Sequence, residues 1–208
     1  MIMGRWILPL AGLALIVMSV GATAADKPVV IIETSVGNFS VELEPEKAPK
    51  TVANFLSYVD KDYYNGTVFH RVIPTFMIQG GGMSSDLKEK KTDKPVKNES
   101  IVFNKNAMSN VRGTIAMART GDPNSATSQF FINLFDRNKF LDDASAPGQP
   151  PAGYTAFGKV IDGMDVVDKI AKAETGEGLM TDSEGRRAPA EDVPTKAIII
   201  KSIKRKAK

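Results

Sequence analysis

The feature that most constrains the fold of this chain is a succession of short apolar runs separated by loops rich in charge, glycine and proline. The run NFSVELE (38–44) alternates apolar and polar residues, which is the period of a half-buried strand. It follows VVIIET (29–34) after a turn at Gly37, so the two runs predict a hairpin. Further runs of strand length are TVFHRVI (67–73), FMIQ (76–79), GTIAMA (113–118), SQFFINL (128–134), YTAFGKVI (154–161) and Ala197–Ile200.

Two segments have helical periodicity. Apolar residues at i, i+3, i+4 and i+7, after a proline suited to a first helical turn, predict a helix near 49–60. A second short helix is expected at 164–172, with Val166, Val167 and Ile170 facing inward. Many sequentially adjacent strands with two helices predict a mainly β fold, in which an antiparallel sheet closes on itself and the helices lie at its ends. Loops are expected at 83–97, 120–127, 142–153 and 174–194.

The first 24 residues predict a secretory signal peptide. Arg5 supplies the positive start, residues 6–20 are apolar, and Ala22-Thr23-Ala24 is a small-x-small cleavage site. The alternative is an uncleaved membrane anchor, but the apolar run is shorter than the roughly 20 residues of a spanning helix. The sequence therefore predicts a signal peptide at 1–24, one domain at 25–208, no stable membrane anchor and a periplasmic location.

Composition excludes several classes of function. The chain has no cysteine and one histidine, His70, so it offers no thiol nucleophile and no His-rich metal site. Removal of residues 1–24 leaves a net charge of +2, which is too balanced to indicate a nucleic-acid partner. The basic cluster at 201–208 is interpreted as a solvated C-terminal tail. We expect a monomer without metal or cofactor.

The segment FHRVIPTFMIQGGG (69–82) combines an arginine, a glutamine, aromatic residues and three glycines. Strand alternation predicts Phe69, Arg71 and Ile73 on one face, with His70 on the other as a structural histidine. Because Pro74-Thr75 interrupts the strand, Arg71 and Gln79 are expected to face each other across neighbouring strands. Considered alone, each residue also fits a plain surface or core role.

Three motifs in this order resemble the cyclophilins, the cyclosporin-type peptidyl-prolyl isomerases. They are FHRVIPTFMIQGG, GTIAMARTGDPNSATSQFFINL (113–134) and FGKVIDGMDVVDKI (157–170). The resemblance covers about residues 29–203 and, after a signal peptide, is closest to the bacterial periplasmic branch. It implies a closed eight-stranded antiparallel β-barrel capped by two helices.

The resemblance also implies a site, residue by residue. Arg71 would be the catalytic arginine, with Gln79 and the Ala118 backbone holding the substrate main chain. The proline pocket would be formed by Phe76, Met77, Phe131 and Leu141, and the groove would be lined by Arg119 and Gln129. Two positions depart from many eukaryotic members: Phe140 replaces a tryptophan, and Tyr154 replaces a histidine. These departures imply that substrate binding is retained and that cyclosporin binds more weakly.

Rotation about an X–Pro bond breaks no covalent bond, so the missing nucleophile and metal are not needed. The sequence predicts a peptidyl-prolyl cis-trans isomerase that assists the folding of exported, proline-containing polypeptides. The alternative is a proline-binding chaperone or holdase whose turnover is incidental. The presence of Arg71 beside Gln79 and Phe131 favours catalysis over that alternative.

Overall fold

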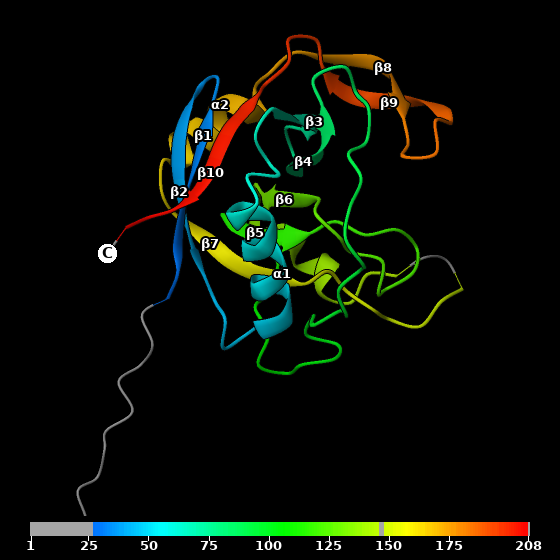
Figure 1. Ribbon diagram of the computed structural model, residues 1–208. Coiled ribbons are helices and arrows are strands. Elements are labelled where there is room, and N and C mark those ends of the chain that lie inside the picture. The colour runs from blue at the N-terminus through cyan, green and yellow to red at the C-terminus, as the bar shows by residue number, and fades with distance from the viewer. Residues whose placement is uncertain (1–26, 146–147, 208) are drawn as a thin grey trace, which may run out of the picture.

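The computed structural model describes residues 27–145 and 148–207, so the predicted signal peptide and the expected first mature residue lie outside the described residues. All strand pairs of the main sheet are antiparallel, in the order β10-β1-β2-β7-β5-β6-β4-β3 (Figure 1). Its strands are β1 (Val29–Thr34), β2 (Gly37–Leu43), β3 (Thr67–Ile73), β4 (Met77–Ser84), β5 (Thr114–Met117), β6 (Phe130–Asn133), β7 (Ala156–Asp162) and β10 (Ile200–Arg205).

The two end strands of this sheet meet, which makes it a nearly closed barrel. The Phe69 N–H donates to the Ile198 carbonyl at 3.0 Å, and the Gly66 N–H donates to the Ile200 carbonyl at 2.9 Å. Val68 and Ile199 form an isolated antiparallel bridge between these bonds. Closure pairs backbone groups that an open edge would leave exposed. The predicted mainly β, eight-stranded antiparallel barrel is confirmed.

The helix α1 (Pro49–Asp60) has the predicted bounds and packs its apolar face on the barrel. Its inward residues are all buried: Val52, Phe55, Leu56 and Val59. The first turn is capped from far along the chain, because the Glu99 carboxylate accepts hydrogen bonds from the backbone N–H groups of Lys50 and Thr51. A negative charge at this end also interacts favourably with the helix dipole.

The helix α2 (Met164–Ala171) confirms the second helical segment. Val167 and Ile170 are fully buried in the main core, whereas Val166 is only partly buried. A 3-10 helix (Asp136–Asp142) follows β6 and carries Leu141 into the protein.

The C-terminal part of the chain corrects two predictions. The last strand is Ile200–Arg205 rather than Ala197–Ile200, because Ile200, Ser202 and Ile203 are the buried positions and Ala197 is exposed. Much of the basic segment that we interpreted as a tail is therefore a strand whose cations face solvent. One of them, Arg205, forms an ion pair with Asp60 at 2.7 Å.

The segment 174–194, expected as a loop, is a second two-stranded sheet. It contains β8 (Thr175–Thr181) and β9 (Arg187–Pro194), and Figure 1 shows this hairpin projecting from the barrel beside β3 and β4. Its exposed, glycine-rich and charged residues lack the apolar alternation that signals a strand. Backbone pairing makes most of this element, and only Val193 and Pro194 at its base are buried.

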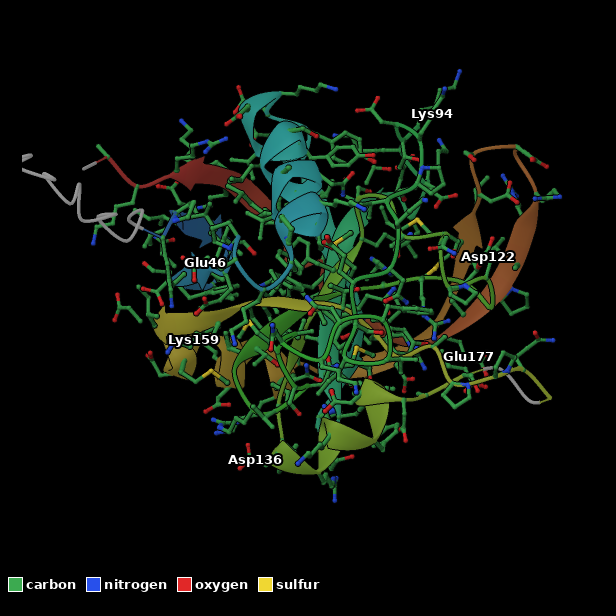
Figure 2. The ribbon with its side chains drawn as sticks, turned by 90° about the horizontal axis from the view of Figure 1, so that it is seen from below. Glu46, Lys94, Asp122, Asp136, Lys159 and Glu177 are labelled. Atoms are coloured by element: carbon green, nitrogen blue, oxygen red, sulfur yellow. The ribbon has the colours of Figure 1, made fainter. Side chains whose placement is uncertain are left out.

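Charged side chains surround the barrel, and those labelled in Figure 2 point outward. Among residues 27–145 and 148–207, no helix is long and apolar enough to cross a membrane. The same residues contain no group of three or more potential metal ligands.

Candidate functional site

A cavity of about 210 Å³ opens on the barrel surface between β3, β4, β6 and the 3-10 helix. Nine of the predicted site residues line it: Arg71, Phe76, Met77, Gln79, Ala118, Arg119, Phe131, Leu141 and Tyr154. They come from distant parts of the sequence, and the sheet order brings them together. The two predicted residues that do not line this cavity are Gln129 and Phe140.

The floor of this cavity is apolar. Met77, Phe131 and Leu141 are buried, at 2%, 4% and 5% exposure, and they form a small hydrophobic cluster with Ala116 and Ala156. This cluster is separate from the main core, so it presents apolar surface to the cavity instead of filling the barrel. Such a pocket fits a small apolar ring.

Aromatic residues form the walls of the cavity. Phe76 stacks on Phe140 with ring centroids 5.8 Å apart, and Tyr154 contacts Phe131 edge to face, also at 5.8 Å. Phe140 is 56% exposed, so it supports Phe76 from the rim of the site.

Arg71 and Gln79 lie opposite each other, as predicted. They are Cα partners across β3 and β4, and both line the cavity. The predicted alternation around them is wrong, because a β-bulge at Phe69–Arg71 shifts the register. As a result Phe69 is buried in the core with Val72, and Arg71 projects outward, 45% exposed.

A side-chain network fixes Gln79. Its Nε2 donates to Gln129 Oε1 at 2.9 Å, and Gln129 Nε2 donates to Glu89 Oε1 at 3.3 Å. Gln129 therefore acts from behind Gln79 and lines a neighbouring polar cavity of about 310 Å³. This second cavity shares Gln79, Ala118 and Arg119 with the first. A peptide could run from one cavity into the other.

Arg119 lines the groove, but its donors are used within the protein. Nε donates to the Gly153 carbonyl at 3.0 Å, and the Nη groups donate to the carbonyls of Thr120 and Ala144, each at 2.9 Å. Its guanidinium also lies 4.3 Å from the Tyr154 ring centroid. These contacts make Arg119 a fixed wall of the groove and leave Arg71 as the cation that faces the cavity.

One of the two backbone polar groups of Ala118 is hydrogen-bonded within the protein. Its N–H donates to the Gln129 carbonyl at 2.9 Å. The carbonyl is therefore the Ala118 group that can accept a hydrogen bond from a substrate.

His70 lies beside Arg71 in sequence but lines neither cavity. The imidazole is 3% exposed, and Nδ1 has no hydrogen-bond partner among the described residues. Burial lowers the pKa of His70 from 6.5 to about 4, so the ring is neutral at neutral pH. This environment agrees with a structural histidine.

The arrangement suits conformational rather than covalent chemistry. The Arg71 guanidinium and the fixed Gln79 amide lie at the edge of an apolar pocket, and the lining residues include no serine, cysteine or histidine. Such a site can hold a ring and place hydrogen-bond donors on an adjoining amide.

Comparison with known proteins identifies the family and agrees with the fold. Residues 29–205 match the family model described as cyclophilin type peptidyl-prolyl cis-trans isomerase/CLD. The chain is 48% identical over 192 residues to peptidyl-prolyl cis-trans isomerase A of Dickeya dadantii, covering 92% of each chain. It is 47% identical over 174 residues to peptidyl-prolyl cis-trans isomerase B of Escherichia coli, covering 84% of this chain and 97% of the relative.

A solved structure is also similar. A cyclophilin type isomerase of Cryptosporidium parvum superimposes with a TM-score of 0.61 at 28% identity, covering 88% of this chain and 99% of that one. A second crystal structure of that protein was determined in the presence of the dipeptide Ala-Pro, and it matches with the same TM-score.

The fold, the pocket and these similarities define a class, the peptide-bond isomerases built on a closed β-barrel. The chain belongs to the cyclophilin-type peptidyl-prolyl cis-trans isomerases. Its activity is the interconversion of cis and trans X–Pro bonds, and its substrates are proline-containing peptides.

Proposed function

We propose that this isomerase acts on exported polypeptides in the periplasm, with Arg71 as its catalytic residue. The observation that carries the proposal is the position of Arg71 and Gln79 on paired strands at the rim of the apolar cavity. The predicted signal peptide at 1–24 supports the location.

The mechanism follows from the energy of the amide bond. Resonance sets a rotation barrier of about 18–20 kcal/mol, and unaided X–Pro exchange takes tens to hundreds of seconds. In the twisted transition state the proline nitrogen becomes pyramidal and regains its lone pair. The Arg71 guanidinium donates to that nitrogen and therefore stabilises the twisted amide more than the planar one.

The remaining residues hold the substrate while the bond rotates. Met77, Phe131 and Leu141 bind the proline ring, and Phe76 closes one side. Gln79 and the Ala118 carbonyl bind the main chain on the flanking side. The apolar floor also removes water that would favour the more polar planar amide.

Arg71→Ala tests the catalytic assignment. Loss of one transition-state donor is expected to lower kcat/KM by about tenfold to a thousandfold, whereas affinity for a proline peptide falls much less. A protease-coupled X–Pro assay gives kcat/KM, and calorimetric titration gives affinity. A folded variant with the wild-type rate would contradict the role of Arg71 and favour a proline-binding holdase.

The mass of the mature protein tests whether the signal peptide is cleaved during export. The mature protein from a cell-envelope fraction is expected to begin at Ala25, because Ala22 and Ala24 place small residues where signal peptidase requires them. Intact-mass spectrometry measures this directly. A full-length mass in the membrane fraction would contradict cleavage and indicate an anchored protein.

A further inference from the structure

The β8–β9 hairpin lies outside the barrel but is firmly attached beside the active site. The Thr181 N–H donates to the Leu87 carbonyl at 2.9 Å, and the Glu89 N–H donates to the Thr181 carbonyl at 2.8 Å. Val193 is buried at the base of the hairpin. An added Cβ on Gly178 would lie 3.2 Å from a Leu87 methyl group, so the two segments approach closely. The hairpin is thus a fixed support rather than a free loop.

The backbone of this hairpin is irregular at one position. Gly176 pairs with Val193 and Gly178 pairs with Ala190, so Glu191 and Asp192 together oppose one residue of β8. Asp192 has φ 61°, in the left-handed region that few residues other than glycine, asparagine and aspartate adopt. A bulge of this kind changes the direction in which a side chain points.

That change of direction places the Asp192 carboxylate beside Arg71. Asp192 Oδ2 lies 3.7 Å from Arg71 Nε, an ion-pair contact longer than a hydrogen bond, and the two side chains are 36% and 45% exposed. Among the described residues, this is the only ion pair that the Arg71 guanidinium makes.

Because the guanidinium is rigid, a contact at one of its edges affects the orientation of the whole group. The group is planar, with its N–H donors in a rigid fork, so an anion close to Nε favours those orientations of the whole plane that keep Nε toward it. With Asp192 at the Nε edge, the Nη groups remain available to the cavity that Arg71 lines.

We propose that Asp192 is a positioning residue that orients the Arg71 guanidinium toward the X–Pro amide. The inference rests on the catalytic role proposed for Arg71. Asp192 does not touch the substrate. It reduces the number of arginine rotamers that the free enzyme populates, so that the donor is in place when the amide twists.

Asp192→Asn is the variant that tests this role. Asparagine has nearly the same size and tolerates the left-handed backbone conformation, so the substitution removes the charge and leaves the hairpin unchanged. We expect kcat to fall about two- to fivefold, the range for loss of a partly exposed ion pair, while KM stays constant. Glu191→Gln is the matched control, because this exposed neighbour loses the same charge without contacting Arg71; its kcat should equal that of wild type.

A double-mutant cycle separates positioning from a structural role. In an Arg71→Ala background, Asp192→Asn should cause no further loss of kcat, because there is no guanidinium left to orient. Asp192→Gly, which also favours the left-handed conformation, provides a second charge-removing variant if the asparagine variant fails to fold. Circular dichroism checks the fold of each protein.

The outcomes distinguish the catalytic role of Arg71 from the positioning role of Asp192. If Arg71→Ala alone retains the wild-type rate, the catalytic assignment of Arg71 fails, and the role of Asp192 fails with it. If Arg71→Ala is slow but Asp192→Asn is as fast as wild type or faster, only the positioning role is overturned. A loss that persists undiminished in the Arg71→Ala background would also overturn it, because Asp192 would then act through another contact.

Discussion

Replacement of the single histidine should change how the stability of this protein depends on pH. His70 is 3% exposed, and burial lowers its pKa from 6.5 to about 4. As the pH falls below 6.5, the unfolded chain binds a proton that the folded protein does not bind until about pH 4. The free energy of unfolding that depends on His70 is therefore fully present above pH 6.5 and is lost progressively between pH 6.5 and 4.

The size of this loss follows from the shift. One pKa unit corresponds to about 1.4 kcal/mol, so a change from 6.5 to about 4 gives a loss of about 3 kcal/mol. That is a large part of the stability of a typical domain, about 5–15 kcal/mol.

Urea denaturation from pH 7 to pH 4 measures the effect in wild type and in His70→Gln, which has no imidazole to titrate. The carboxylates are common to both proteins, so the difference between the two curves isolates His70. We expect wild type to lose about 3 kcal/mol more than the variant over this range. Parallel curves would refute the reasoning. If the variant does not fold, NMR titration of the single imidazole in wild type decides the question, and a midpoint near 6.5 would be contradictory.

Two further substitutions and one control variant test the site rim and the core. Phe140→Trp should raise cyclosporin affinity by up to about tenfold, since an indole N–H adds one hydrogen bond; unchanged affinity in a fluorescence titration would show that this rim position is not used. Gly81→Ala should lower the free energy of unfolding by about 3 kcal/mol, because its Cβ would lie 2.7 Å from Phe130 and 2.9 Å from Tyr64 at φ 83°. Gly66→Ala, at φ 77° with no atom within 4 Å of the added carbon, should cost only about 1 kcal/mol in the same urea denaturation, and equal losses would exclude the packing contribution.

Much of the fold could be predicted because local patterns agree with the structure. Pro49 and the apolar spacing after it gave the bounds of α1, and alternation in residues 38–44 gave the first hairpin. The pairing of Arg71 with Gln79 followed from the interruption at Pro74-Thr75.

The failures have a common physical cause, which is that backbone geometry can depend on distant contacts. The bulge at Phe69–Arg71 breaks the alternation that the residues suggest. The β8–β9 hairpin is held by hydrogen bonds to the Leu87–Glu89 segment, which no pattern within 174–194 reveals.

Part of the candidate site could not be predicted from the sequence either. The family resemblance predicted eleven site residues. Asp192 and Glu89 were not among them, because neither residue lies in one of the three motifs. Asp192 reaches Arg71 only because of its left-handed backbone conformation, and Glu89 contributes by holding Gln129. An aspartate in a charged, glycine-rich segment would ordinarily be interpreted as a solvated surface residue.

The central claim is that positioned guanidinium donors, rather than positive charge alone, lower the barrier to X–Pro rotation. Arg71→Lys tests it most directly, because lysine keeps the charge but loses the planar fork and some reach. The measurement is the cis-trans exchange rate of an X–Pro peptide bound at saturation, obtained by two-dimensional exchange NMR, so that differences in affinity do not enter. We expect the lysine variant to remain at least about tenfold slower than wild type. A folded Arg71→Lys protein that exchanges the bound peptide at nearly the wild-type rate would contradict the claim.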